Sequence, residues 1–221
     1  MPGTQKEKQI KETWLQMEKM GVIEKVGKGE PTIWSSPLHK ADGTLRPVGD
    51  YRILNSKTTT DNYPLPSLRH FSSKLKGAKI FSSIDLYRAY FQIELTRSAS
   101  EKTTLVTPFG AYRFLRLPMG IKNSAASFQR LMSTILNGLD NVFCYLDDIL
   151  VFDQNESNNK KSIVEVFKWL EANGLSINTK KCHFGKQRLK FLGYQVDGGG
   201  IVPLPRKLQA IAEFPIPQKP K

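Results

Sequence analysis

The sequence predicts an α+β fold, in which strands and helices interleave without regular βαβ repeats. One observation is at residues 143–152, where two apolar runs rich in aromatic and β-branched side chains flank an acidic pair. That pattern is typical of two buried strands joined by a tight turn. Another is the helical spacing of Phe128, Met132 and Ile135, which indicates a long helix from about Ser124. With 221 residues, 39% of them hydrophobic, the chain can bury a real core in one compact or lobed domain.

The same rules predict the remaining elements in order. Ile10, Trp14 and Met17 share one face of a helix over residues 6–20 that Gly21 ends. Asp42-Gly43 is a hairpin turn signal between extended segments. The other expected strands are 22–26, 34–39, 45–52, 79–84, 91–95, two runs within 104–115, 175–177 and 189–196; the other expected helices are within 65–75, 163–170 and 206–214; residues 55–62, 98–104 and 117–120 are expected to be polar segments or loops.

The charge balance favours a polyanionic partner. Lys and Arg number 33 against 20 Asp and Glu, which gives a formal net charge of +13. Phosphates attract such side chains, although a generally basic, solubilising surface has the same composition. The two cysteines lack zinc-site spacing and indicate a reducing compartment. No apolar run is long enough to span a membrane and no signal peptide is present, so we expect an intracellular, soluble protein that is not secreted and has no membrane partner.

Three carboxylates are the candidate chemical centre. Asp147 and Asp148 occupy the tip of the expected hairpin, and Asp85 directly follows the strand at residues 79–84. If these ends converge, their oxygens suit hard Mg²⁺ ions, and two such ions about 4 Å apart can promote phosphoryl or nucleotidyl transfer. The alternative is a hairpin whose acidic turn is simply solvated, because Asp is common in turns.

An ordered series of motifs then covers nearly the whole chain. It comprises RPVGDYRILN at residues 46–55, FSSIDL at 81–86, TPFG at 107–110, LPMG at 117–120, SFQR at 127–130, YLDDILV at 145–151 and FLGY at 191–194. With these motifs in this order, the chain resembles the reverse transcriptase domain of gypsy-type long-terminal-repeat retrotransposons.

The resemblance implies a right-hand polymerase with fingers and palm, the palm being an antiparallel sheet backed by helices. Its fingers would cover about 1–79 and 96–118 and its palm about 80–95 and 119–200. Residues 201–221 would begin a thumb that is largely missing, so that the chain is expected to be a piece of a Pol polyprotein. Residues 39–44 form a shorter fingers hairpin than the family usually has.

The resemblance also assigns roles to individual residues. Asp85, Asp147 and Asp148 would be catalytic and bind two Mg²⁺ ions, with Mn²⁺ as a substitute. Lys181 would donate a proton or positive charge to the departing pyrophosphate. Lys40 and Arg46 would bind the triphosphate. Tyr90 would block a 2′-hydroxyl, and Met119 and Gly120 would face the nascent base pair. Leu192, Gly193 and Tyr194 resemble the primer grip. Several of these roles have a structural alternative. Arg46 could be an ordinary surface charge, and Lys181 could belong to a solvated basic loop. Tyr90 and residues 192–194 could simply be packed in the core.

The implied activity is RNA-directed DNA polymerisation for retrotransposon replication. The implied partners are an RNA or DNA template with its primer, deoxynucleoside triphosphates and other segments of the same polyprotein. The implied location is cytoplasmic particles and the nucleus. Two alternatives stay open: a degenerate nucleic-acid-binding remnant that no longer polymerises, and a divalent-metal nuclease, which would not explain the ordered motifs.

Overall fold

In the computed structural model, the chain divides into two compact units. The first contains residues 1–63 and 88–130, and the second contains residues 64–87 and 131–221. The described residues are 5–27, 33–34, 38–39, 45–46, 49–205, 208–209 and 213. The assignment of fingers, palm and thumb to particular ranges stays a prediction.

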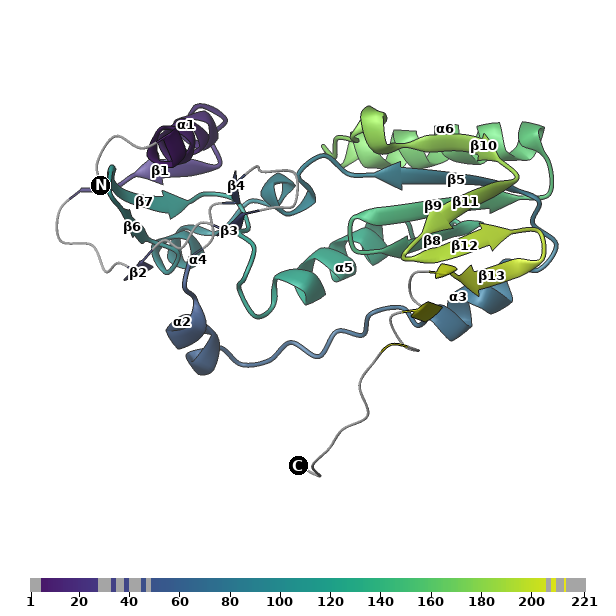
Figure 1. Cartoon of the computed structure of the whole chain (residues 1–221), viewed down its shortest axis with the longest axis horizontal. Coiled ribbons are helices and arrows are strands. Elements are labelled where there is room, and N and C mark those ends of the chain that lie inside the picture. The colour runs from purple at the N-terminus through teal and green to yellow at the C-terminus, as the bar shows by residue number, and fades with distance from the viewer. Residues whose placement is uncertain are drawn as a thin grey trace, which may run out of the picture. The chain divides into compact units, whose positions relative to one another are not determined.

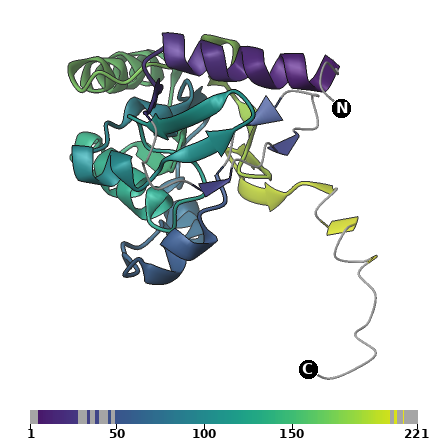
Figure 2. The same cartoon turned by 90° about the vertical axis from the view of Figure 1, so that its left-hand side faces the viewer.

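A four-stranded sheet forms the centre of the first unit. Its strand order is β1 (Ile23–Lys25), β7 (Gly110–Phe114), β6 (Leu105–Thr107) and β2 (Ile33–Trp34); the β2–β6 pair is parallel and the others are antiparallel. Helix α1 (Gln5–Lys19) lies along one face of this sheet (Figure 2). Its buried Trp14 packs against Tyr112, with ring centroids 5.4 Å apart, and Met17 belongs to the same core. The predicted apolar face of this helix is therefore confirmed.

Shorter elements complete the first unit. A two-stranded antiparallel ladder joins β3 (Leu38–His39) to β4 (Leu45–Arg46), on either side of the predicted Asp42-Gly43 turn, which lies outside the described residues. The remaining elements are α2 (Arg52–Lys57), the 3₁₀ turn η1 (Ala89–Gln92), α4 (Arg97–Glu101) and the start of α5 (Ser124–Ile135), which continues into the second unit.

The second unit is built on an antiparallel sheet with the strand order β10-β5-β9-β8 (Figure 1). Its strands are β5 (Ile80–Asp85), β8 (Val142–Tyr145), β9 (Asp148–Asp153) and β10 (His183–Lys186). A second antiparallel sheet contains β11 (Arg188–Phe191), β12 (Tyr194–Asp197) and β13 (Gly200–Pro203). The helices are α3 (Leu68–Lys74), α6 (Glu156–Ala172) and the 3₁₀ turn η2 (Thr179–Lys181).

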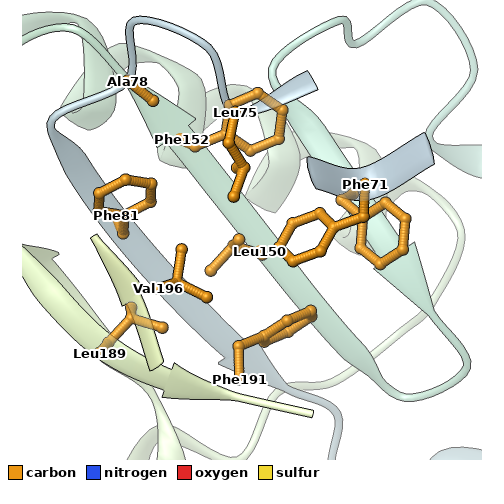
Figure 3. Close-up of a cluster of buried hydrophobic side chains, with 10 residues drawn as sticks. Phe71, Leu75, Ala78, Phe81, Leu150, Phe152, Leu189, Phe191 and Val196 are labelled. Atoms are coloured by element: carbon orange, nitrogen blue, oxygen red, sulfur yellow. The ribbon is translucent and has the colours of Figure 1, made fainter. Parts of the chain in front are cut away.

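The pleat of β5 separates two environments. Phe81 faces a cluster of aromatic and aliphatic side chains from α3 and the segment after it, β8, β9, β11 and β12. The members labelled in Figure 3 are Phe71, Leu75, Ala78, Phe81, Leu150, Phe152, Leu189, Phe191 and Val196. The next residue, Ser82, is fully buried and donates a hydrogen bond to Asn159 Oδ1 of α6 at 2.5 Å. Successive strand residues point to opposite faces, so β5 is held between this core and α6.

The α+β class and the antiparallel sheet backed by helices are confirmed, as are the hairpin at residues 143–152 and the long helices. Three local predictions were wrong. Residues 52–57 form a helix rather than a returning strand and loop, and residues 89–92 form a 3₁₀ turn where a strand was expected over 91–95. Residues 188–197 form a hairpin instead of one strand. Within the polar segment expected over residues 98–104, the structure adds a short helix at residues 97–101.

Two further outcomes concern single segments. Residues 175–177 contribute only an isolated bridge between Ile177 and Leu86. The predicted helix at residues 206–214 lies mostly outside the described residues. Among the helices of the described ranges, none combines the length and apolar character that a membrane span requires.

Candidate active site at the end of the β5–β9 pair

The register of the central sheet brings two of the three predicted carboxylates together. Asp85 is the last residue of β5 and Asp148 is the first residue of β9, and the two are direct partners in the antiparallel ladder. Directly opposed residues in such a pair have Cβ atoms roughly 5 Å apart. The ladder continues through Ile84 and Ile149, both fully buried, so the carboxylates stand at the edge of a rigid core.

Asp147 lies in the two-residue turn between β8 and β9. The turn places Leu146 at a φ of 54°, in the left-handed region that non-glycine residues rarely adopt. The backbone N–H of Leu86 donates to the carbonyl of Asp147 at 3.3 Å, which ties the turn to the end of β5. A bulky residue with positive φ implies stored strain, and such strain concentrates at functional sites.

Burial and the neighbouring charges both disfavour the ionised form of Asp148. Burial, followed by the negative charges of Asp147 and Asp85, raises the pKa of this carboxyl to about 6, although the nearby Lys181 ammonium acts in the opposite direction. Desolvation and like charge both penalise the ionised form. The same burial, together with Asp147 and Asp148, raises the pKa of the Cys144 thiol, which keeps that side chain neutral.

The η2 segment, which follows α6, lies beside these carboxylates. The backbone N–H of Asn178 donates to the carbonyl of Asp85 at 2.8 Å, which holds the η2 turn beside the strand end. This places Lys181 Nζ 3.5 Å from Asp85 Oδ2. The Lys181 side chain is 66% exposed, so this ion pair is loose and solvated.

A hollow of about 180 Å³ opens at these strand ends. The residues that line it come from β5, β9, η2, β10 and β11 with the turn after it: Ser83, Ile84, Asp85, Asp148, Lys181, His183, Lys190, Phe191 and Leu192. The structure thus brings together four predicted site residues, namely Asp85, Asp148, Lys181 and Leu192. Asp147 is in the adjoining turn and is not part of the lining.

The donor set suits hard divalent cations, although it is not gathered into a finished metal site. Asp85, Asp147 and Asp148 offer carboxylate oxygens, which Mg²⁺ prefers. A bound cation would relieve the repulsion that raises the pKa of Asp148. Within the described residues, however, no three His, Cys, Asp or Glu side chains are placed to hold one ion together.

The predicted primer-grip residues form the turn between β11 and β12. Leu192 has a φ of 48° and Gly193 a φ of 75°, so two consecutive residues are left-handed, as a tight hairpin turn requires. Tyr194 starts β12 opposite Phe191. Leu192 is a second strained leucine beside the carboxylates, and its role in primer binding stays a prediction.

The nucleotide-contact candidates belong to the first unit. Tyr90 lies in η1 with its ring centroid 5.1 Å from that of the fully buried Phe128. Met119 and Gly120 lie in the loop before α5, and the Gly120 carbonyl accepts a hydrogen bond from Asn55 Nδ2 at 2.8 Å. Arg46 ends β4, and Lys40 lies outside the described residues. The roles of these residues stay predictions.

Among the lining residues that the sequence did not predict as site residues, two carry basic side chains, His183 and Lys190. His183 lies in β10, a four-residue strand whose side chains are all exposed, so it has no hydrophobic alternation to identify it. Lys190 is an exposed residue between the buried Leu189 and Phe191, which is the alternation expected of a strand. The sequence pattern predicts a single strand over residues 189–196, which joins this strand, β11, to β12. The position of Lys190 beside the carboxylates depends on how the second sheet packs on β5, which no local pattern shows.

Comparison with known proteins identifies close sequence relatives. The profile of the family described as "Reverse transcriptase (RNA-dependent DNA polymerase)" matches residues 38–196. The retrovirus-related Pol polyprotein from transposon 297 of Drosophila melanogaster is 41% identical over 178 residues, which are 80% of this chain and 17% of that polyprotein. The transposon Tf2-3 polyprotein of Schizosaccharomyces pombe is 34% identical over 184 residues, or 82% of this chain and 14% of the relative. The chain therefore spans less than a fifth of these relatives.

Solved structures share the fold. A foamy viral protease-reverse transcriptase in complex with double-stranded DNA superposes with a TM-score of 0.86 at 24% identity, over 95% of this chain and 37% of the viral chain. The foamy viral protein in complex with an RNA/DNA hybrid gives a TM-score of 0.84 at 24% identity, over 97% of this chain and 29% of that one.

Proposed function

Because the chain belongs to the reverse transcriptase (RNA-dependent DNA polymerase) family, we propose that it is an RNA-directed DNA polymerase domain that extends a primer by nucleotidyl transfer. The observation that carries the proposal is the register that sets Asp85 directly opposite Asp148, with Asp147 in the adjoining turn. The expected partners are a primed RNA or DNA template and deoxynucleoside triphosphates. The viral structural relatives bind double-stranded DNA and an RNA/DNA hybrid, which supports this choice.

In the proposed reaction, the primer 3′ oxygen attacks the α-phosphorus of the nucleotide and pyrophosphate leaves. Asp85, Asp147 and Asp148 would hold Mg²⁺, which supplies charge neutralisation at the attacking and leaving oxygens when it is bound. The sheet contributes positioning, because two of these carboxylates are fixed to neighbouring strands rather than to mobile loops. Lys181, held near Asp85 by the Asn178 contact, would donate a hydrogen bond to the departing pyrophosphate.

Discrimination against ribonucleotides is assigned to Tyr90. Its ring packs against Phe128, which is fully buried and so cannot yield easily. A ring supported in this way can exclude a 2′-hydroxyl by steric clash, which is a repulsive route to specificity.

The experiment is single-turnover extension of a labelled primer on RNA and DNA templates, with Mg²⁺ and deoxynucleotides. Extension that the wild type carries out and that Asp85→Asn abolishes is the expected result. A protein that binds primed template at normal affinity and extends it on neither template, in Mg²⁺ or Mn²⁺, would be a nucleic-acid-binding module and not a polymerase.

A further inference from the structure

The hollow beside Asp85 and Asp148 has a rim of nitrogen donors from three different elements. Lys181 comes from η2, His183 from β10 and Lys190 from β11. Of these, only Lys181 was assigned a role above. His183 and Lys190 therefore require an explanation of their own.

The pleat of β11 accounts for the direction of Lys190. Leu189 and Phe191 are buried in the aromatic core, whereas Arg188 and Lys190 between and before them are exposed. Because successive strand residues point to opposite faces, the two basic side chains emerge away from the core.

The two basic residues differ in how their charge is balanced. Arg188 is opposite Asp197 in the ladder and forms an ion pair with it, Nε to Oδ2 at 3.3 Å. Lys190 is opposite the neutral Gln195. Over the described ranges, no carboxylate lies within ion-pair distance of the Lys190 ammonium, although this residue lines the hollow.

Size limits what the hollow can accept. Its volume of about 180 Å³ is below the range of roughly 300–1,000 Å³ that is usual for pockets that enclose a whole small molecule. A single phosphate group fits that limit, and it matches the chemistry of an ammonium and an imidazole N–H, both of which donate hydrogen bonds to anionic oxygen.

We propose that Lys190 and His183 form a phosphate subsite of this hollow, which binds one phosphate group of the primer strand or of the incoming nucleotide while the reacting atoms lie at Asp85 and Asp148. This inference rests on the proposed function for the identity of the nucleic acid. Lys190 supplies the charge and His183 a directional hydrogen bond from the neighbouring sheet edge.

Lys190→Gln tests the subsite, and Lys186→Gln is the matched control. Lys186 is an exposed residue of β10 that undergoes the same change in charge but is not part of the hollow. The binding of a fluorescent primer–template is measured by anisotropy between 50 and 200 mM salt, with Ca²⁺ in place of Mg²⁺. Loss of one phosphate contact reduces the salt slope by about 0.9, so wild-type affinity should fall about 3.5-fold more than that of Lys190→Gln across this range.

Neutral linkages then locate the phosphate. Each of the last primer phosphates is replaced in turn by a methylphosphonate. The loss of primer affinity that Lys190→Gln causes should disappear when one particular linkage is replaced. If the phosphate belongs to the nucleotide, Lys190→Gln instead raises the KM for deoxynucleotide while primer affinity and kcat change little. Lys190→Arg should restore either effect, and His183→Gln should reproduce part of it.

The proposal is overturned if Lys190→Gln matches Lys186→Gln in the salt slope, the linkage scan and the nucleotide KM. It is also overturned if Lys190→Gln reduces primer affinity equally with every neutral linkage and leaves the nucleotide KM unchanged. Lys190 would then act only through the overall electrostatic field of the protein. Anisotropy does not require catalysis. A protein that binds through Lys190 but never extends a primer would therefore contradict the proposed polymerase activity and retain the subsite.

Discussion

We predict that Asp148→Asn stabilises the metal-free protein while it abolishes nucleotide incorporation. Asp148 is opposite Asp85 in the ladder and next to Asp147, and burial together with these charges raises its pKa to about 6. A raised pKa means that the ionised carboxyl is destabilised in the folded protein, so removing its charge should increase the free energy of unfolding. Strained, like-charged active sites commonly reduce stability in this way.

The magnitude follows from the same values. A change from the ordinary pKa of 3.8 to about 6 corresponds to a ceiling of about 3 kcal/mol at neutral pH. Because the side chain is only about half-buried, solvent screening reduces this to about 1 kcal/mol. For a chain of this length, that free energy corresponds to a rise in Tm of roughly 2–4 °C.

Thermal unfolding in EDTA at several pH values is the assay. Folded Asp148 binds its proton more tightly than unfolded Asp148, so wild-type stability should fall as the pH rises from about 4 to about 6. The advantage of Asp148→Asn should therefore be absent below pH 4 and complete above pH 6. Added Mg²⁺ should raise the Tm of the wild type more than that of the variant.

Asp140→Asn is the matched control, because Asp140 is exposed in the loop before β8 and loses the same charge. If Asp148→Asn at pH 7 is no more stable than Asp140→Asn, the carboxylates are not in electrostatic conflict. The argument for cation binding at this position would then fail.

Three further predictions follow from the same contacts. Asp147→Asn should keep the Tm within about 2 °C of the wild type and lose extension in single-turnover assays; near-normal extension would remove Asp147 from the site. Tyr90→Ala should admit ribonucleotides in single-nucleotide assays while Tyr90→Phe, which keeps the ring against Phe128, should not; equal sugar discrimination in both variants would reduce Tyr90 to a packing residue. Asn159→Ala should lower the free energy of unfolding in urea by about 2 kcal/mol because it leaves the buried Ser82 hydroxyl without its acceptor, whereas the exposed Asn158→Ala should have little effect.

The parts of the fold that the sequence predicted correctly are those with long periodic signals. Helix α1 shows its burial pattern through Trp14 and Met17, and the β8–β9 hairpin through continuous apolar runs on both sides of the acidic pair. Both signals arise from burial against a core, which fixes the side-chain spacing whatever the rest of the chain does. The converging carboxylates could be predicted for the same reason, since Asp85 and Asp148 directly adjoin buried strands.

The errors occur where tertiary contacts override a weak local signal. Helix α2 has no buried residue, and its Asn55 side chain is instead bonded to Gly120 and to the backbone N–H of Lys122, 67 residues further along the chain. Helix α4 did carry a local signal, because the Thr96 hydroxyl accepts from the Ala99 N–H as an N-cap.

The β11–β12 hairpin was hidden by Leu192, a residue with poor intrinsic preference for the left-handed conformation that its turn requires. A sequence rule that looks for Asn or Gly at this position fails at Leu192, and the same rule fails at Leu146, where the turn bears Asp147. Leu192 lines the hollow, and Leu146 lies two residues before Asp148, which also lines it. Both leucines adopt a strained backbone conformation, and both lie beside the position at which the proposed polymerase would hold its metal ions and its primer. We infer that local disagreement between sequence and structure marks this site as clearly as its carboxylates do.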